Sequence, residues 1–364
     1  MIRVLQCVNN MHRAGLETML MNYYRNLDRE KIQFDFLVHR QERSDYDDEI
    51  ECMGGHIYRA PRLYPQNYPA YFAYMKQFFR EHPEYKIVHS HIDAMSYLPL
   101  LAAKKANVPV RIAHSHSSSI DRDSKYWVKQ GFRMLLPRVA THLFSCGEIA
   151  GQFLFRGKAY QIIPNAIDAS QFLFNSEIRD GRRRELNLDG KYVVGHVGRF
   201  SYPKNHEFLV DIFVQIYEKE KKAVLMLVGT GEKEEKIREY VQAQGLSDAV
   251  MFMGNRSDVN ELYQVMDVFV MPSLFEGVPL VGVEAQFSGL PCVFSDKVPG
   301  EVMFTEKCEF VDLNQSAERF ADVVLAQRNK ERDSGTAFCT TYDVRHACRL
   351  LEESYIHLYE QRGR

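Results

Sequence analysis

Short apolar segments recur along most of the chain and constrain its fold more than any other feature. Each has at most seven residues, and most are rich in Val, Ile or Phe. They lie at residues 2–8, 34–39, 86–91, 110–116 and 142–146, and again at 192–198, 223–229, 250–254, 268–273 and 291–295. Helix-like segments generally separate them, which is typical of buried strands in parallel sheets. We therefore predict two α/β units.

The boundary between these units is predicted within residues 162–191. This segment is polar and rich in turn-forming residues after Asn165, and it has no comparable strand pattern. A chain of 364 residues is long enough for two domains of ordinary size. We predict an N-terminal domain at residues 1–167 and a C-terminal domain at residues 168–342.

The last segment, residues 343–364, is predicted to form a separate terminal helix over residues 343–360. Apolar residues three and four positions apart mark one face of it: Val344, Ala347, Leu351, Tyr355 and Leu358. Such a stripe is stable only against a partner surface, so we expect this helix to pack on one of the domains.

Composition argues against several classes of protein. The formal net charge of −2 gives no electrostatic basis for binding nucleic acid. No 18 consecutive apolar residues could cross a membrane, and the apolar run at the N-terminus is too short for a signal peptide. The seven cysteines show no Cys-x-x-Cys spacing, and most lie in apolar surroundings, where reduced thiols behave as small apolar groups. We expect a cytoplasmic protein.

Two glutamates, Glu276 and Glu284, stand in the otherwise apolar stretch PSLFEGVPLVGVEA at residues 272–285. Pro279 suits the first turn of a helix that Gly289 would end, so Glu276 is expected in the preceding loop and Glu284 in the helix. The helix start would offer free backbone N–H groups to a phosphate or sugar oxygen, at Val278, Leu280 and Val281. Alternatively, Glu276 complements the helix dipole and Glu284 forms a salt bridge.

Two cations, Arg199 and Lys204, lie in the stretch VGHVGRFSYPKNH at residues 194–206. A strand is expected to end at Gly198, and a helix is expected to start near Lys204. Cations at that helix start oppose the dipole but are well placed to hold a diphosphate. The alternative is a solvated surface loop.

These motifs together resemble those of retaining glycosyltransferases of the GT-B fold, in the fourth family of group 1 glycosyl transferases. The matching segments are HRAGLE, IIPNAID, GRFSYPKN, VGTGE and EGVPLVGVE. Within this family, residues 272–296 look most like enzymes of bacterial exopolysaccharide or capsule synthesis. The resemblance implies two Rossmann-like parallel-sheet domains that face each other across a cleft, with the terminal helix crossing back to the first.

The resemblance also implies roles for individual residues. Glu284 would bind the ribose hydroxyls, Glu276 would approach the donor sugar, and Arg199 and Lys204 would neutralise the diphosphate. Gly15 would face the same diphosphate from the first domain, although Arg13, Ala14 and Gly15 replace the family's usual pair of glycines. Further contacts to the nucleotide sugar are implied for Gly229, Arg256, Gly277, Val278, Pro279, Leu280 and Val281.

Four histidines form two His-x-His pairs, His89 with His91 and His114 with His116. Three roles are considered for them: metal ligands, structural hydrogen-bonded groups, or catalysis by one of them. His114, at the end of the fifth strand, matches the family's histidine near the donor sugar and acceptor. We expect His114 to orient the reacting groups and assign no metal ligands.

Residues 124–138 are predicted to form a basic amphipathic helix in which Lys125, Lys129 and Arg133 lie four positions apart. Such a helix can lie on an anionic bilayer, where a lipid-linked acceptor would be found. The alternative is a surface helix that packs on its own domain.

The expected activity is transfer of a hexosyl group from a nucleoside diphosphate sugar, with uridine as the expected base, to a glycan or lipid-linked acceptor. The resemblance implies a retaining enzyme, a hexosyltransferase, that needs neither cofactor nor metal ion. The alternatives are a glycoside hydrolase that uses the two glutamates and a nucleotide-sugar-binding protein without turnover. The expected location is the cytoplasm, with peripheral association at the membrane face left open.

Overall fold

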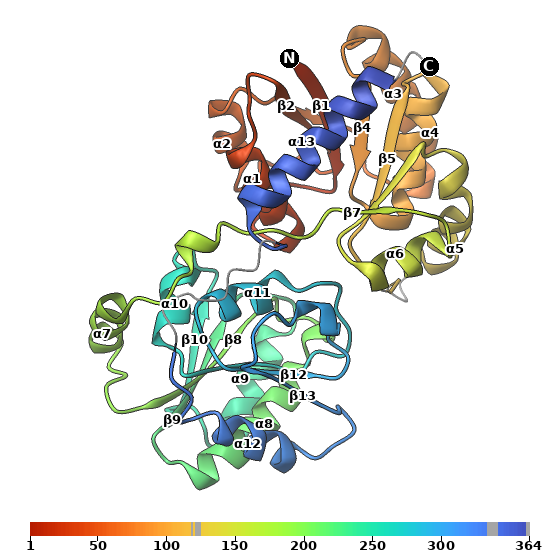
Figure 1. Cartoon of the computed structure of the whole chain (residues 1–364). Helices are drawn as coiled ribbons and strands as arrows, with labels where there is room; N and C mark the ends of the chain where they lie inside the picture. The colour runs from red at the N-terminus through yellow and green to blue at the C-terminus, as the bar shows by residue number, and fades with distance from the viewer. Residues whose placement is uncertain (118, 121–124, 333–340, 362–364) are drawn as a thin grey trace. The chain divides into compact units, whose positions relative to one another are not determined.

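The computed structural model describes residues 1–117, 119–120, 125–332 and 341–361 (Figure 1). The chain divides into two compact units. The first comprises Met1–Ile167 and Thr340–Arg364, and the second comprises Asp168–Cys339. Each unit is built on one sheet, and all the paired strands in both sheets are parallel.

The first unit has a seven-stranded sheet in the order β3-β2-β1-β4-β5-β6-β7. Its strands are β1 (Ile2–Val8), β2 (Ile32–Val38), β3 (Ile57–Arg59), β4 (Ile87–Ser90), β5 (Val110–Ser115), β6 (His142–Ser145) and β7 (Gln161–Ile162). Its helices are α1 (Gly15–Asn26), α2 (Asp47–Cys52), α3 (Tyr68–Glu81), α4 (Tyr97–Lys105), α5 (Tyr126–Leu135), α6 (Glu148–Phe155) and α13 (Val344–Gln361).

The second unit has a six-stranded sheet in the order β10-β9-β8-β11-β12-β13. Its strands are β8 (Tyr192–Val197), β9 (Ala223–Val228), β10 (Val250–Gly254), β11 (Val268–Met271), β12 (Cys292–Ser295) and β13 (Cys308–Val311). Its helices are α7 (Ser176–Glu185), α8 (His206–Lys219), α9 (Glu234–Ala243), α10 (Val259–Val265), α11 (Leu280–Phe287) and α12 (Ala317–Ala326).

Both sheets therefore have the doubly wound order expected of Rossmann-like units, which confirms the predicted fold class. In each sheet the order of the strands reverses once, between β1 and β4 in the first unit and between β8 and β11 in the second. Ligands of open α/β sheets bind beyond the carboxyl ends of the strands at such a point. The loops after these four strands are therefore the places to look for a site.

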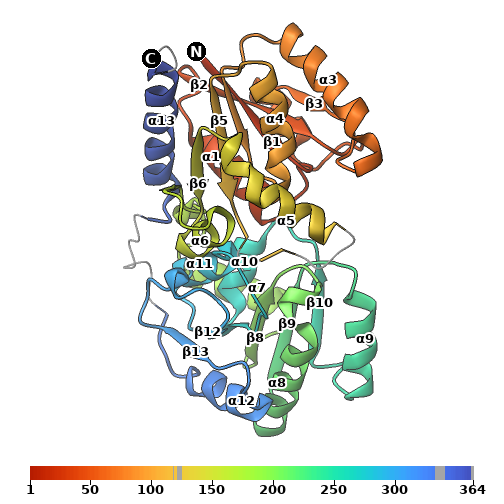
Figure 2. The same cartoon turned by 90° about the vertical axis from the view of Figure 1, so that its right-hand side faces the viewer.

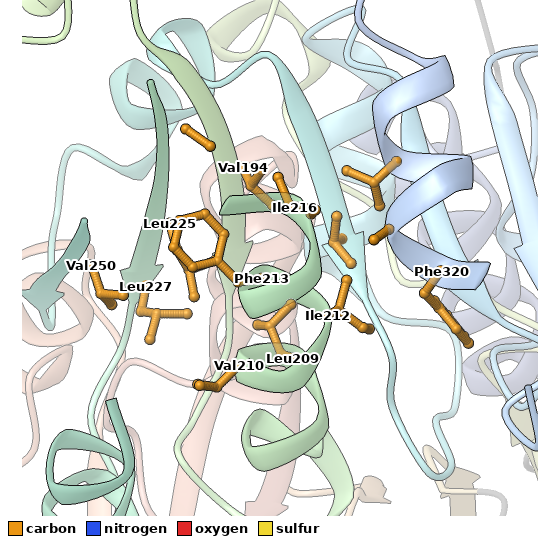
Figure 3. Close-up of a cluster of buried hydrophobic side chains, with 14 of the residues drawn as sticks. Val194, Leu209, Val210, Ile212, Phe213, Ile216, Leu225, Leu227, Val250 and Phe320 are labelled. Carbon is orange, nitrogen blue, oxygen red and sulfur yellow. The ribbon is translucent and has the colours of Figure 1, made fainter. Parts of the chain in front are cut away.

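The apolar core of the second unit explains why its strands are continuous apolar runs. Figure 3 shows side chains of α8, such as Leu209 and Phe213, packed against Leu225 and Leu227 of β9 and Val194 of β8. Phe320 of α12 lies in the same cluster, and α12 contacts α8. Figure 2 shows α8, α9 and α12 of the second unit, the three helices that supply these and neighbouring apolar side chains. A strand buried in this way cannot alternate polar and apolar residues.

The terminal helix α13 belongs to the first unit, as Figures 1 and 2 show in blue, and it contacts α1. All five residues of its predicted apolar face are buried: Val344, Ala347, Leu351, Tyr355 and Leu358. The return of this helix to the first unit is therefore confirmed. Of the cysteines in the described residues, only Cys52 is exposed and none forms a disulfide, while Cys339 lies outside them.

Candidate active site

The loops after β8 and β11 lie side by side in the second unit, because these strands are neighbours at the point where the strand order reverses. Two hydrogen bonds join the loops. The Leu274 amide donates to the Pro203 carbonyl at 2.8 Å, and the Asn205 side-chain amide donates to the Pro272 carbonyl at 3.1 Å. The two motifs that carry the predicted cations and carboxylates therefore meet at one edge of the sheet.

Lys204 and Glu276 form an ion pair between these loops. Lys204 Nζ donates to Glu276 Oε1 at 2.6 Å, and their side chains are only 18% and 13% exposed. The aliphatic stem of Lys204 lies against Gly198, where a Cβ would stand 3.3 Å from Lys204 Cδ and Cε. The pair is therefore held in place and partly shielded from water, which strengthens its electrostatic interaction.

Gly229 allows the loop after β9 to approach the loop after β8. Its φ of +133° favours glycine, and a Cβ there would lie 2.2 Å from the carbonyl oxygen of Gly198. The close approach of these two loops therefore requires glycine at residue 229. The nucleotide contact that the resemblance implies for Gly229 is a separate reason.

Arg199 lies at the same edge of the sheet but pairs with a different carboxylate. Its guanidinium contacts Glu232, in the loop after β9, at 3.0 Å, and the two side chains are 73% and 56% exposed. An exposed ion pair of this kind contributes little stability, so Arg199 can exchange Glu232 for another anion at small cost.

The helix α11 starts one residue later than predicted. Pro279 is the N-cap, with extended backbone (φ −75°, ψ 115°), and its carbonyl accepts from the amides of Gly282 at 3.0 Å and Val283 at 3.3 Å. The expectation that Pro279 lies in the first turn is therefore wrong, because a residue whose carbonyl opens the helix precedes its first turn. Leu280 and Val281 are the first two residues of the helix.

Glu284 lies in α11, and its carboxylate accepts a hydrogen bond from the buried Tyr263 hydroxyl of α10 at 2.9 Å. Burial raises the pKa of Glu284 to about 7, and the hydrogen bond from Tyr263 opposes this rise. Glu276 pairs with Lys204, and Glu284 forms no salt bridge among the described residues, so the alternative role predicted for Glu284 is not seen.

Arg256 follows β10, at the same edge of the sheet. It donates two hydrogen bonds to Asp258, at 2.7 Å from Nε and 2.6 Å from Nη2. The bidentate pair raises the pKa of Arg256 and lowers that of Asp258. A nucleotide that binds Arg256 must therefore share it with this carboxylate.

Two buried histidines beside Lys204 were not predicted from the sequence. The rings of His196, on β8, and His206, the first residue of α8, lie 4.8 Å apart. Burial lowers the pKa of His196 to about 4 and that of His206 to about 2, and the charge of Lys204 contributes to both shifts. Both are therefore neutral at pH 7. Their positions flanking the cation motif are the signal that would have found them.

The predicted histidines meet in the first unit, at the carboxyl ends of β4 and β5. The ring centroids of His89 and His114 lie 5.1 Å apart, and those of His91 and His116 lie 5.2 Å apart. Burial lowers the pKa of each of the four rings below its usual value.

Gly15 is the first residue of α1, the helix after β1, and a Cβ at this position would find no atom within 4 Å.

A metal site was considered for these histidines, and one nitrogen of each of His89, His91 and His114 lies within 4.8 Å of the others. The nitrogens of His89 and His91 are engaged in hydrogen bonds, to Tyr355, His114, Gln6 and His116. A metal ion would have to displace some of these bonds. We therefore assign no metal ligands in this cluster.

Two aspartates two positions apart can also hold a divalent cation, and this Asp-x-Asp spacing occurs twice, at Asp45 with Asp47 and at Asp121 with Asp123. Asp45 accepts from the Arg13 amide, and Asp47 from Arg59. Asp121 and Asp123 lie outside the described residues.

The basic helix is present as α5, although Ser124 lies outside the described residues. Its Trp127 and Met134 are 82% and 64% exposed. Two of its cations turn back to their own unit: Lys125 lies 4.0 Å above the Tyr64 ring and Arg133 lies 4.2 Å above the Phe153 ring. No helix in the described part of the chain is both long and apolar enough to span a membrane.

Family models match both units. Residues 13–171 match the model described as Glycosyltransferase Family 4, and residues 191–327 match the model described as Glycosyl transferases group 1. Among solved structures, the Anabaena protein Alr3699/HepE in complex with UDP has a TM-score of 0.80 at 17% identity, and the match covers 98% of this chain and 100% of that one. That likeness supports the fold.

Two curated bacterial proteins are similar over most of their length. The putative glycosyltransferase EpsF of Bacillus subtilis (strain 168) is 37% identical over 82% of this chain and 80% of its own. The capsular polysaccharide biosynthesis glycosyltransferase CapH of Staphylococcus aureus is 24% identical over 98% and 99%. With the family models and the paired parallel-sheet units, this similarity shows that the chain belongs to glycosyltransferase family 4 and is a glycosyltransferase.

Proposed function

We propose that the protein transfers a hexosyl group from a uridine diphosphate sugar, with retention at the anomeric carbon and without a metal ion, to a glycan or lipid-linked acceptor in surface polysaccharide synthesis. The observation that carries the proposal is the Lys204–Glu276 pair beside the start of α11. It combines a cation, a carboxylate and a helix N-terminus at the point where the strand order reverses.

The leaving diphosphate is the group that needs stabilisation in this reaction. Negative charge grows on its β-phosphate as the bond to the sugar breaks. Lys204 and Arg199 supply positive charge, and the start of α11 supplies the positive end of a helix dipole. Glu232 releases Arg199 when the diphosphate arrives, because their exposed pair is weak.

The carboxylates have separate roles in the proposal. Glu284 accepts hydrogen bonds from the ribose hydroxyls, with Tyr263 orienting it. Glu276, beside Lys204, faces the donor sugar, where its negative charge favours an oxocarbenium-like transition state. His114 of the first unit orients the reacting groups, and Gly15 lets the backbone approach the diphosphate. Gly277, Val278, Leu280 and Val281 line the start of α11 and complete the nucleotide-sugar contacts.

The names of similar proteins support the choice of donor and acceptor. Solved structures of Alr3699/HepE are described as complexes with UDP and with UDP-glucose. An Escherichia coli relative that is 29% identical over 58% of this chain is named a UDP-Gal:alpha-D-GlcNAc-diphosphoundecaprenol alpha-1,3-galactosyltransferase. The exposed Trp127 and Met134 of α5 fit peripheral contact with a membrane that holds a lipid-linked acceptor.

The test is slow hydrolysis of a panel of nucleotide sugars, followed by mass spectrometry with and without EDTA. We expect one uridine donor to release UDP at equal rates in both conditions, because cations of the chain take the place of a metal ion. Loss of turnover in EDTA would overturn metal independence. Binding of a donor without any turnover would instead favour the nucleotide-sugar-binding alternative.

The stereochemistry needs its own measurement. NMR of the product formed from an α-linked donor should show an α-linkage, and a β-linked product would contradict retention.

A further inference from the structure

A chain of buried hydrogen bonds runs from β1 through α13 to His114 in the first unit. Gln6 Nε2 donates to the Tyr355 hydroxyl at 3.1 Å, and this hydroxyl lies 2.6 Å from His89 Nδ1. His89 Nε2 in turn lies 3.1 Å from His114 Nδ1. Gln6 and His89 are register partners on the neighbouring strands β1 and β4, so the sheet itself fixes the spacing.

The carbonyl oxygen of the Gln6 side chain determines which group donates each hydrogen bond in this series. Gln6 Oε1 lies 2.8 Å from His91 Nε2, and because a carbonyl oxygen only accepts, His91 must donate there. The Gln6 NH₂ group is thereby directed at Tyr355. His91 Nδ1 then accepts from His116 Nε2, which lies 2.9 Å away.

The proton positions along the chain follow from this direction. The Tyr355 hydroxyl is fully buried and accepts from Gln6, so it donates its own hydrogen to His89 Nδ1. A neutral His89 then carries its hydrogen on Nε2 and donates it to His114 Nδ1. A neutral His114 must carry its hydrogen on Nε2.

The N–H at His114 Nε2 is a hydrogen-bond donor that a substrate oxygen could use. His114 is 1% exposed, and its Nε2 completes no hydrogen bond within the described residues. Hydrogen bonding with the backbone of Ile163 raises the pKa of His114 against the larger effect of burial, so this backbone competes with a substrate oxygen for the N–H. A buried donor without a partner costs free energy, so this one needs a physical reason, and a hydrogen bond to a substrate oxygen would supply it.

We propose that Tyr355 and His89 are positioning residues that keep His114 in the Nε2–H form, so that His114 donates a hydrogen bond to an oxygen of the hexosyl donor or acceptor. This inference rests on the proposed function for the identity of the substrate. It gives the terminal helix α13 a part in the reaction, because Tyr355 is the residue through which that helix reaches the histidines.

The tautomers can be observed directly, without any substrate. Protein labelled with ¹⁵N-histidine, at pH 8, should show both His89 and His114 as Nε2–H tautomers in long-range ¹H–¹⁵N spectra, with the His114 signals assigned by their loss in His114→Gln. In Tyr355→Phe the donor to His89 Nδ1 is lost, and both rings should become tautomer mixtures. Tyr23→Phe is the matched control, because it removes another buried hydroxyl of this unit, one that donates to the Pro164 carbonyl at 2.7 Å.

Three results would overturn the proposal. One is His114 as the Nδ1–H tautomer in the parent protein, which would mean that the Gln6 amide is turned and the chain runs the other way. Another is unchanged tautomers in a folded Tyr355→Phe protein. The third is a joint shift of the His89, His91 and His114 signals with one equivalent of Zn²⁺, which would make the cluster a metal site.

Activity supplies a second readout. Tyr355→Phe should lower the turnover of the hydrolysed donor at least about tenfold with little change in its KM, since an incorrect tautomer affects the reacting geometry more than binding. His114→Gln keeps an N–H near the Nε2 position and should retain more activity than His114→Ala. In the His114→Gln background, Tyr355→Phe should have little further effect. If no donor is hydrolysed but His89 and His114 are both Nε2–H tautomers that depend on Tyr355, the proposed function is wrong and the hydrogen-bond series from Gln6 to His114 is still supported.

Discussion

Lys204 donates a 2.6 Å hydrogen bond to Glu276 across two loops that are 72 positions apart in the sequence. Each side chain satisfies the other while no ligand is present. The pair also places a positive and a negative group at one edge of the sheet, where a diphosphate and a sugar of developing positive charge would each meet the opposite sign. Removing one partner of such a partly buried ion pair should cost substantial free energy, because the other charge is left without a partner.

Lys204→Ala should weaken UDP binding about tenfold or more, because it removes the less exposed of the two cations and leaves Glu276 to repel the diphosphate. Titration calorimetry with UDP measures this. Lys219→Ala is the control, since Lys219 pairs with Asp322 on the surface of the same unit. Equal UDP affinity in the parent, Lys204→Ala and Lys219→Ala proteins would remove Lys204 from the site.

Substitutions of Arg199 and Glu232 should change the affinity for UDP in opposite directions. Arg199→Ala should weaken UDP binding, because it removes a cation, whereas Glu232→Gln should strengthen it several-fold, because the guanidinium no longer has to leave a carboxylate. Both effects should shrink at high salt, where exposed charges are screened. If Glu232→Gln weakens UDP binding, Glu232 has a direct role in holding the nucleotide.

The strands in the interior of both sheets could be predicted from the sequence, and the strands that could not be predicted lie at sheet edges. All ten apolar segments are strands, whereas β3, β7 and β13 were missed. These three are edge strands, and both residues of β7 are exposed. An edge strand buries fewer side chains, so its sequence carries less of the apolar signal.

The candidate site shows the same division. Arg199, Lys204, Glu276 and Glu284 could be recognised because each stands next to a strand or helix end that has its own local signal. Their partners could not, since a pairing such as that of Tyr355 with His89 joins residues 266 positions apart. Only the packing of α13 against the first unit determines which buried hydroxyl meets that ring.

Binding of the ribose should depend on pH through Glu284. Burial raises the pKa of Glu284 to about 7, so its carboxylate form, which accepts from ribose hydroxyls, is lost as the pH falls below that value. UDP should bind about tenfold more tightly than its 2′-deoxy analogue at pH 8, and the difference should disappear by pH 5.5. Calorimetry with both nucleotides measures it, and their identical phosphates cancel the titration of the ligand.

Tyr263→Phe should move this pH dependence upward. The Tyr263 hydroxyl lowers the pKa of Glu284 by bonding to its carboxylate, so its removal raises the pKa further. Glu284→Gln should remove the pH dependence of the ribose preference altogether. A preference that stays constant between pH 5.5 and 8 in the parent protein would contradict the assignment of Glu284 to the ribose.

Trp127 is the only tryptophan of the chain, and it is 82% exposed. If α5 lies on anionic membranes, its fluorescence should shift to shorter wavelength with vesicles that contain phosphatidylglycerol and stay unchanged with pure phosphatidylcholine. Lys129→Glu should weaken the shift, because it reverses a charge on this helix. Lys158→Glu, at an exposed site on the same unit, should not. An unchanged spectrum with both vesicles would favour the surface-helix alternative.

Gly229→Ala and Gly181→Ala should change stability in opposite directions. At Gly229 a Cβ would lie 2.2 Å from the Gly198 carbonyl oxygen, in a backbone with φ of +133°. Alanine there should lower the free energy of unfolding by about 2 kcal/mol or more. It should also weaken UDP binding, because it displaces the loop that carries Arg199.

At Gly181, inside α7, a Cβ would find no atom within 4 Å. Alanine there should stabilise the second unit by about 0.5–1 kcal/mol, because it lowers the entropy of the unfolded chain and favours the helix. Thermal unfolding and UDP titration of both variants measure this. A Gly229→Ala protein that unfolds like the parent would mean that the two loops can move apart, and the close approach of β8 and β9 would then not be what fixes Arg199.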